Sequence, residues 1–189
     1  MSHSTALPAI DKVSSGDQDV SQAMATAIFE SHYAKIYNYI YYRVCCDKHL
    51  AEDLTSEVLE KIILKINTYN KDKAQLDVWM FAIAKNTVND HFRYWKKRKL
   101  FSIESIKNLI AGSDTPEGLA LAAEQNRSLA AALSTLKQTE QNIIALKFGA
   151  NLKNTEIAAL LNMSETNVGV TLYRSVKKLR NEMSKEDVL

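Results

Sequence analysis

The stretch from Leu76 to Lys99, LDVWMFAIAKNTVNDHFRYWKKRK, combines aromatic rings and cations on one predicted helix. It contains Trp79, Phe81, Phe92, Tyr94 and Trp95, and it ends in four consecutive cations. Aromatic rings stack on flat ligands and cations bind anions, so this composition favours a ligand that is both flat and anionic. The stretch therefore predicts a helix that binds nucleic acid.

Helical periodicity divides this stretch into two faces. One face gathers apolar and small residues, and we expect it to pack: Leu76, Met80, Ile83, Ala84 and Thr87. The other gathers cations and amides that can bind phosphates and base edges: Lys85, Asn86, Asn89, Arg93 and Lys96. The rings at its edges, Phe81, Phe92, Tyr94 and Trp95, favour stacking on single-stranded bases, whereas Trp79 is expected in the core. The simpler alternative is a solvated charged face.

A second candidate lies near the C-terminus, in NTEIAALLNMSETNVGVTLYRSVKKLR. Asn154 or Thr155 is expected to cap a first helix, and Ser164 a second, with about three residues between the helices. Val168, Leu172, Val176 and Leu179 form the inward stripe of the second helix. This pattern predicts a helix-turn-helix whose second helix can lie in the major groove of duplex DNA.

The composition excludes several classes of protein. The chain has 189 residues, 46% of them hydrophobic and 24% charged, with a net charge of +2, which is typical of a globular protein of one large or two small domains. Because no run of eighteen apolar residues and no secretory signal pattern occurs, we expect a cytoplasmic location without membrane insertion. The adjacent Cys45 and Cys46 lie in an apolar-rich helical stretch and are expected to be buried free thiols.

No catalytic constellation emerges from the motifs. The four His residues lack the spacing of metal ligands, and no motif combines a nucleophile, a base and an orienting group. A glycine-rich phosphate loop is missing as well. The sequence therefore predicts a protein that is not an enzyme and needs neither a metal nor a cofactor.

The elements that would position these motifs are all helices, since no run alternates apolar and polar residues convincingly. The predicted fold is all-α, with two small helical domains joined by a flexible linker. We expect a tail over 1–23, a first domain over 24–100, a linker over 101–124 and a second domain over 125–189. The predicted helices span 24–44, 50–66, 76–99, 126–134, 139–148, 155–161 and 165–183.

Three motifs, in this order, resemble those of bacterial extracytoplasmic-function (ECF) sigma factors, which retain regions two and four of the sigma-70 family. LAEDLTSEVLEKI is similar to the family's acidic AEDLxQExFL helix, and WMFAIAKNTVNDHFR is similar to WLxxIAxNxxxDxxR. The stretch from LSTLKQ to SVKKLR is similar to the family's region-four pattern, including EIAxxL. The resemblance covers the chain from about Ile28 to Met183.

The resemblance implies a surface that docks on the clamp helices of the largest RNA polymerase subunit. Carried over to this sequence, the implied residues are Glu52, Asp53, Leu54, Glu57, Leu59 and Ile62. Exposed carboxylates there would meet basic groups and set the orientation of docking. The alternative, carboxylates that only complement a helix dipole, explains Glu52 and Asp53 but not Glu57 or Glu60.

The resemblance also implies contacts with the minus-ten promoter element. The loop from Tyr69 to Gln75 would correspond to the family's specificity loop, which holds a base turned out of the stack, although an ordinary turn is the alternative. Asp90 is expected to organise its neighbours. The implied minus-ten residues are Asn70, Gln75, Lys85, Asn86, Asn89, Arg93 and Lys96.

In the second domain, the resemblance implies contacts with the minus-thirty-five duplex by Glu165, Thr166, Asn167, Val170, Tyr173 and Arg174. Gly169, Val170 and Thr171 depart from the more basic pattern of many relatives, so we expect weak, less salt-dependent binding by this domain alone. Arg174 is the best candidate for a bidentate guanine contact. Lys177, Lys178 and Arg180 are expected to reach phosphate or to solvate the helix.

The function implied is promoter-specific transcription initiation, with binding to core RNA polymerase through its clamp and flap, recognition of both promoter elements and help in melting the DNA. An anti-sigma factor, often a membrane-bound one in the family, is the implied regulator. Two alternatives remain open at this point. A helix-turn-helix regulator would bind operator duplex without polymerase, and a protein-interaction module would carry its basic helix incidentally.

Overall fold

The computed structural model describes residues 17–101 and 120–186, and these residues form helices and turns with no strand. The all-α prediction is confirmed. The elements are α1 (Asp17–Arg43), α2 (Lys48–Lys65), the short 3-10 helix η1 (Ile66–Thr68), α3 (Leu76–Phe101), α4 (Ala120–Ser134), α5 (Gln138–Ile144), the π-helical turn η2 (Ala145–Gly149), α6 (Asn154–Leu161) and α7 (Glu165–Glu186).

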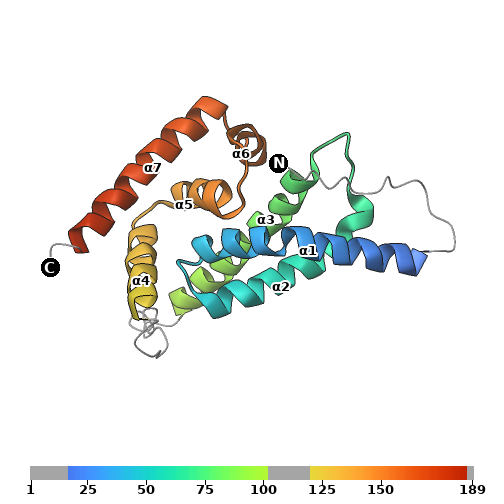
Figure 1. Cartoon of the computed structure of the whole chain (residues 1–189), viewed down its shortest axis with the longest axis horizontal. Helices are drawn as coiled ribbons and strands as arrows, with labels where there is room; N and C mark the ends of the chain where they lie inside the picture. The colour runs from blue at the N-terminus through green and yellow to red at the C-terminus, as the bar shows by residue number, and fades with distance from the viewer. Residues whose placement is uncertain (1–16, 102–119, 187–189) are drawn as a thin grey trace.

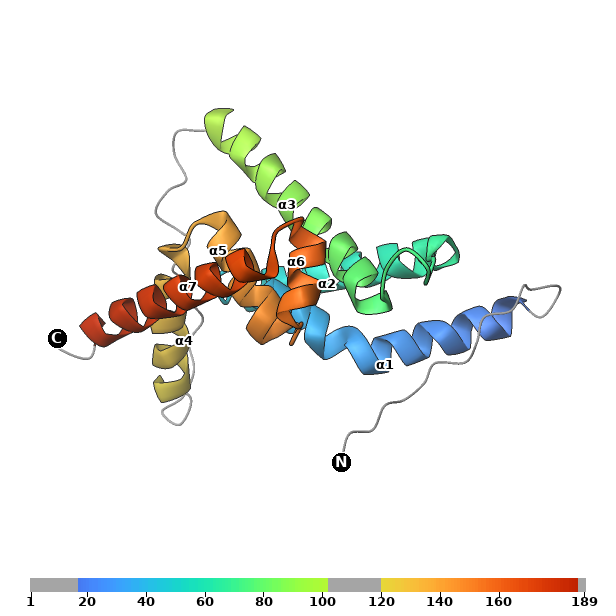
Figure 2. The same ribbon diagram turned by 90° about the horizontal axis from the view of Figure 1, so that it is seen from above.

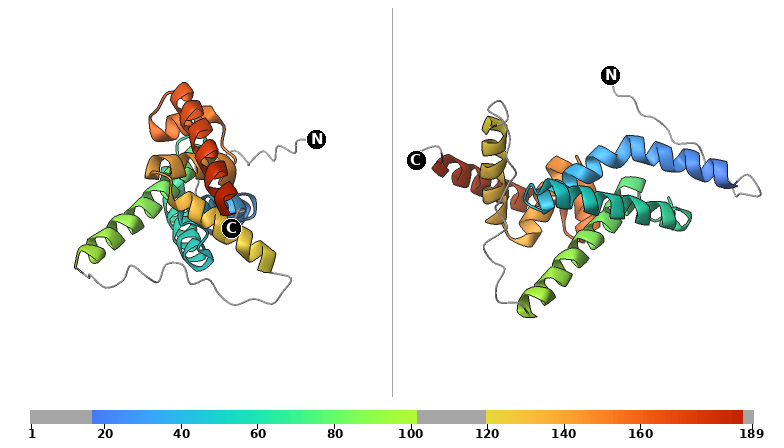
Figure 3. Two further views of the ribbon diagram at one scale, coloured as in Figure 1. Left: turned by 90° about the vertical axis from the view of Figure 1, so that its left-hand side faces the viewer. Right: turned by 90° about the horizontal axis from the view of Figure 1, so that it is seen from below.

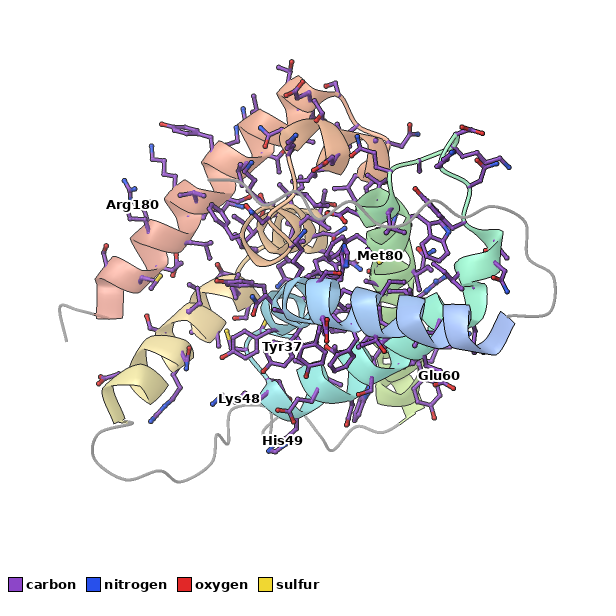
Figure 4. The ribbon with its side chains drawn as sticks, turned by 45° about the vertical axis from the view of Figure 1, so that its right-hand side comes forward. Tyr37, Lys48, His49, Glu60, Met80 and Arg180 are labelled. Carbon is purple, nitrogen blue, oxygen red and sulfur yellow. The ribbon has the colours of Figure 1, made fainter. Side chains whose placement is uncertain are left out.

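The first three helices form one part of the molecule. α1 and α2 lie side by side along most of their length, and α3 crosses them and projects from the body at its C-terminal end (Figures 1 and 2). Apolar side chains at helical spacing fill the space between them, among them Ile36, Ile62 and Met80, which are fully buried. Met80 lies between the helices in Figure 4. The core thus fixes which face of α2 and α3 turns outward.

The remaining helices form the second part. α7 packs on α4 and α5 through its predicted inward stripe, where Leu172, Val176 and Leu179 contact the buried Leu133, Leu136 and Ile144. Figure 3 shows α7 and α4 on the opposite side of the body from the free end of α3. The stripe expected from the sequence therefore holds α7 in place.

The two parts share a continuous core, where the sequence predicts two domains joined by a flexible linker. The buried residues of α1, α2 and α3 belong to the same cluster as Ile143, Leu146 and Ile157 of the second part. The Tyr39 hydroxyl donates a buried hydrogen bond of 2.8 Å to Asn142 Oδ1, and burial raises the pKa of Tyr39 to about 12. Long-range apolar contacts of this kind leave no local pattern in the sequence.

Gly149 sets the distance between the two parts. A Cβ atom at this position would lie 2.7 Å from both the carbonyl oxygen of Asn38 and the backbone nitrogen of Tyr39. Such a separation is shorter than a carbon atom tolerates from a non-bonded oxygen or nitrogen. Neither neighbour can rotate away, because both are backbone atoms of α1. The backbones of η2 and α1 therefore touch, which only glycine permits.

Some element boundaries differ from those expected. α1 begins at Asp17 and α4 at Ala120, inside the predicted tail and linker, and the alanines in both segments are strong helix formers. Lys153, rather than Asn154 or Thr155, precedes the first turn of α6, and its backbone N–H donates to the Glu156 carboxylate. The rest of the predicted tail and linker, 1–16 and 102–119, lies outside the described residues.

Cys45 and Cys46 lie in the turn after α1, between the first two predicted helices. Both have left-handed backbone angles, with φ of 52° and 66°, which end the helix. The thiols are free and only partly buried. Burial nevertheless raises the pKa of both, that of Cys46 to about 11, so they stay protonated at neutral pH.

Candidate functional site

The exposed face of α2 is acidic. Asp47 caps the helix by accepting the backbone N–H of Leu50 at 3.0 Å, and the buried residues on the opposite side orient the helix. The carboxylates that point outward are Glu52, Asp53, Glu57 and Glu60, and Figure 4 shows Glu60 pointing away from the body. Glu57 pairs with Lys61 at 2.6 Å, which leaves the face with a net negative charge. This face can attract a basic protein surface.

Three of the residues expected on the polymerase-binding surface lie in the core instead. Leu54, Leu59 and Ile62 are 3%, 7% and 0% exposed, because helical periodicity turns them toward α1 and α3. In this conformation they hold α2 in place and do not reach a partner. Sequence reasoning missed Ile63 and Leu64, which are exposed beside the acidic face. In the sequence these two apolar residues already fall outside the inward stripe of α2, so their exposure could have been predicted.

On α3, part of the predicted minus-ten face is open to solvent. Asn86, Arg93 and Lys96 are exposed, and Arg93 pairs with Asp90 one turn earlier. Asp90 thus orients a neighbouring cation, the organising role expected of it. Because the pair is exposed, the Arg93 guanidinium can exchange this carboxylate for a phosphate at little cost.

The other part of that face is engaged by the second part of the molecule. Lys85 Nζ donates to the carbonyl oxygen of Leu160 at 3.2 Å. Asn89 Oδ1 accepts two hydrogen bonds, from Arg43 at 3.1 Å and from Gln138 at 3.2 Å. The structure therefore divides the predicted minus-ten face into an open half and a covered half.

The aromatic residues of α3 also divide into two groups. Tyr94 and Trp95 are 58% and 51% exposed and remain candidates for base stacking. Phe81, expected at the edge, is fully buried and meets Tyr39 edge to face, with ring centroids 5.6 Å apart. Phe92 is half-buried beneath the guanidinium of Arg43. Trp79 packs against the core, as expected, and contacts Tyr69.

The loop between η1 and α3 contains the two remaining minus-ten candidates, Asn70 and Gln75, both exposed. Asn70 Oδ1 accepts the backbone N–H of Asp72 at 2.8 Å and so shapes the turn. Its amide nitrogen can donate outward. The start of α3 beside this loop is tied to α1, because Asp77 lies 3.0 Å from His32 Nε2 and 3.2 Å from Lys35 Nζ.

In the second part, α6, the turn 162–164 and α7 form the predicted helix-turn-helix. Asn162 takes the left-handed conformation that ends α6, with φ of 53°, and Ser164 Oγ accepts the backbone N–H of Asn167 at 3.2 Å. Every residue predicted to face the minus-thirty-five element is exposed: Glu165, Thr166, Asn167, Val170, Tyr173 and Arg174. Val168 between them is fully buried and anchors the helix.

Further along α7, the cation Lys178 forms an ion pair with another helix of the same chain. Lys178 Nζ lies 2.8 Å from the Glu140 carboxylate of α5, and this hydrogen bond lowers the pKa of Glu140. Lys177 and Arg180 are exposed, and Figure 4 shows Arg180 directed outward. The basic end of α7 thus has two cations free to reach phosphate.

The described residues were also searched for metal-binding clusters and for membrane-spanning helices. No group of His, Cys, Asp or Glu side chains within 17–101 and 120–186 could hold a metal ion. The helices formed by those residues are too short or too polar to cross a membrane.

Comparison with known families matches the two parts separately. Residues 28–98 match Sigma-70 region 2, and residues 126–179 match Sigma-70, region 4. The first match covers most of α1 through α3, and the second begins within α4 and ends within α7. Together they span all three candidate surfaces.

Two curated relatives agree with these matches. The chain is 29% identical over 152 residues to the ECF RNA polymerase sigma factor BldN of Streptomyces coelicolor, covering 80% of this chain and 57% of that protein. It is 28% identical to the ECF RNA polymerase sigma factor SigM of Bacillus subtilis, covering 71% of this chain and 80% of that protein. The chain thus aligns with little more than half of BldN's length.

Solved structures share the fold. The sigma factor RpoE of Bartonella quintana, in complex with the anti-sigma factor NepR, superposes with a TM-score of 0.64 at 18% identity, over 88% of this chain and 98% of that one. CnrH, in complex with the cytosolic domain of CnrY, gives a TM-score of 0.59 at 15% identity, over 90% and 92%. On the evidence of the matched regions and the curated relatives, the chain belongs to the sigma-70 family. It is an RNA polymerase sigma factor of the ECF group and acts in promoter-specific transcription initiation.

Proposed function

We propose that this chain docks on core RNA polymerase through the acidic face of α2, binds the minus-ten element with α3 and reads the minus-thirty-five element with α7. The observation that carries the proposal is the presence, in one chain, of an exposed recognition helix and a separate acidic helix face. A regulator that binds operator duplex without polymerase needs the first but not the second.

The acidic face provides the contact with polymerase. Glu52, Asp53, Glu57 and Glu60 meet basic groups on the clamp of the largest subunit, while Ile63 and Leu64 supply apolar contact beside them. Charged groups at the rim of such an interface speed association and fix its orientation, and the apolar centre provides much of the affinity. The second part of the chain contacts the polymerase flap.

The outward face of α7 reads duplex DNA. Arg174 has the length and fork geometry to bind guanine O6 and N7 in the major groove, a contact that discriminates between bases by about 1–3 kcal/mol. Lys177 and Arg180 follow on the same helix and bind phosphate. This division assigns sequence reading to the first turns of α7 and positioning to its later turns.

The exposed half of α3 binds the melted minus-ten strand. Tyr94 and Trp95 stack on unpaired bases, which is worth about 1–3 kcal/mol per base, and Arg93 and Lys96 bind the strand's phosphates. The loop residues Asn70 and Gln75 hold a base turned out of the stack. Binding the single strand more tightly than the duplex favours promoter melting.

The protein acts by binding in the cytoplasm, where polymerase and chromosome meet, and it has no catalytic activity of its own. The solved RpoE and CnrH structures contain NepR and a domain of CnrY as partners. By analogy, an anti-sigma factor regulates this chain, and a membrane-bound regulator would deliver signals from outside the cell. Neither a metal nor a cofactor takes part.

A charge reversal on α2 tests the docking surface. Asp53→Lys is expected to reduce binding to core polymerase from the same organism by about tenfold, because it places a cation against a basic surface. The control Glu124→Lys makes the same change at an exposed position on α4 and should leave binding within about twofold. Surface plasmon resonance with immobilised polymerase measures both, and equal binding by the Asp53 variant and the wild type would remove α2 from the docking surface.

A further inference from the structure

Two thiols lie next to each other in the turn that joins α1 to α2. Cys45 and Cys46 are the two cysteines of the chain, and both are free and partly exposed. Lys48 and His49, which follow them at the start of α2, lie at the outer edge of the molecule in Figure 4. A ligand from solvent can therefore reach this turn. The proposed function uses neither thiol.

The backbone of the turn does not explain why cysteine occupies both positions. Cys45 and Cys46 have left-handed backbone angles, with φ of 52° and 66°. Glycine, asparagine and aspartate adopt this conformation more readily than other residues do. Ending α1 therefore accounts for the shape of the turn but not for its pair of sulfur atoms.

The two sulfur atoms are poorly placed to bond to each other. Adjacent Cα atoms are about 3.8 Å apart, whereas a disulfide without strain joins Cα atoms about 4.4–6.8 Å apart. Burial raises the pKa of both thiols, and protonated thiols oxidise more slowly than thiolates. The pair therefore stays reduced and available to a ligand.

The donors and charges at the turn select the kind of ligand. Thiols prefer soft elements. Within 17–101 and 120–186, no group of three or more His, Cys, Asp or Glu side chains could hold a metal ion, so zinc, which takes four ligands, does not fit the pair. Burial raises the pKa of Cys45 and the nearby Arg43 guanidinium opposes that rise, while Lys48 adds a second positive charge close by in the sequence. These charges disfavour a metal cation and favour an uncharged ligand.

We propose that Cys45 and Cys46 together form a binding site for trivalent arsenic, either as arsenite or as an organic arsenical. Trivalent arsenic is soft, bonds two thiols at once and is uncharged as arsenite at neutral pH. Two As–O bonds are replaced by two As–S bonds, and each thiol proton leaves with the displaced oxygen as water, so arsenite releases two water molecules. Arsenic stays trivalent, and no oxidant or reductant is needed.

The bridging atom also removes the geometric obstacle to joining the two side chains. Arsenic lies between the sulfurs, so the ring that it closes is larger than that of a direct disulfide and fits adjacent residues with less strain. Loading also competes with a contact to the second part of the chain, where Gln141 Nε2 donates to Cys45 Sγ at 3.9 Å. The site therefore lies where the turn meets α5.

Phenylarsine oxide and intact-protein mass spectrometry provide the first test. The reduced full chain should take up one phenylarsenic group with loss of one water molecule. Because the chain has two cysteines, this stoichiometry assigns the group to them. Prior incubation with excess arsenite should block the uptake, since both arsenicals need the same pair of thiols. A wild-type chain without the adduct, or uptake that arsenite does not block, would overturn the proposal.

Single substitutions distinguish a pair of thiols from two independent ones. Cys45→Ser and Cys46→Ser should each weaken phenylarsine oxide binding by about a hundredfold, because the second As–S bond then loses its intramolecular partner. The control combines Cys46→Ser with Ser56→Cys, at an exposed position on α2, which keeps two thiols but separates them. It should bind as weakly as Cys46→Ser. Wild-type affinity in any of these variants would mean that the thiols act singly.

Circular dichroism establishes that each variant keeps its helices. If Cys46→Ser loses them, Cys46→Ala replaces it, because an apolar side chain preserves the packing of this residue against Leu133 and Leu136. The expected hundredfold loss is the same for both substitutions. The site depends on the two thiols alone, so its failure would leave the proposed function unaffected.

Discussion

The DNA-binding faces proposed on α3 and α7 differ in how much of each the protein itself occupies. On α7, all six predicted contact residues from Glu165 to Arg174 are exposed. On α3, Lys85 and Asn89 are hydrogen-bonded to the second part of the chain, while Arg93 and Lys96 are exposed. In this conformation the proposed face of α7 is therefore open along its length, whereas only half of the proposed face of α3 is open.

The largest effect should come from the residue that joins the two parts. Tyr39→Ala removes a fully buried ring, its edge-to-face contact with Phe81 and its bond to Asn142, and should lower the free energy of unfolding by about 3–5 kcal/mol. Tyr173→Ala, at a 71% exposed position on α7, should change it by less than about 0.5 kcal/mol. Urea denaturation measures both, and similar values would mean that the shared core is not a structural unit.

On α7, Arg174→Ala should weaken binding to minus-thirty-five duplex by about 1–3 kcal/mol, which is about five- to 150-fold. Gel shifts with the promoter and with a duplex changed at the contacted guanine provide the measurement. If the loss is equal on both duplexes, Arg174 binds phosphate and does not read sequence.

On α3, Asn89→Ala removes the acceptor of the hydrogen bonds from Gln138 and Arg43, so it should lower the free energy of unfolding by about 1 kcal/mol. Asn86→Ala, at an exposed position on the same helix, should change it by less than about 0.5 kcal/mol. Urea denaturation measures both, and equal values would argue that Asn89 does not join α3 to the second part.

The smallest effect concerns a contact within the first part alone. The hydrogen bond with His32, together with Lys35, lowers the pKa of Asp77, so the folded state binds this proton less readily than the unfolded chain. The stabilisation is present above the unfolded pKa of about 3.9 and is lost as the pH falls through the lower folded value. Asp77→Asn should reduce stability by about 1 kcal/mol at neutral pH and flatten its acid dependence. An unchanged acid dependence would show that other carboxylates control it.

Local features of the sequence predicted the helix-turn-helix well. The second helix begins at Glu165 as expected, because Ser164 acts as its cap, and the stripe of Leu172, Val176 and Leu179 faces inward. On α2, the exposed carboxylates agree with the prediction, but the family motif also includes Leu54, Leu59 and Ile62, which are buried. The helical period alone would have separated the two sets.

The covered half of α3 could not have been predicted in the same way. The partners of Lys85 and Asn89, namely Leu160, Gln138 and Arg43, lie between 46 and 75 residues away in the sequence. No local pattern encodes such a pairing. Gly149 offers no local sign either, since its backbone does not need a positive φ and its role depends only on the approach of α1.

Run-off transcription tests the central claim most directly. Core RNA polymerase from the same organism is combined with the purified full chain and with genomic fragments, and new transcripts are mapped. The account predicts discrete start sites that appear only when the chain is added and that share one pair of upstream elements. If polymerase gains no start sites while the chain alone shifts specific duplex DNA, the chain acts as an operator-binding regulator and the sigma-factor account is contradicted.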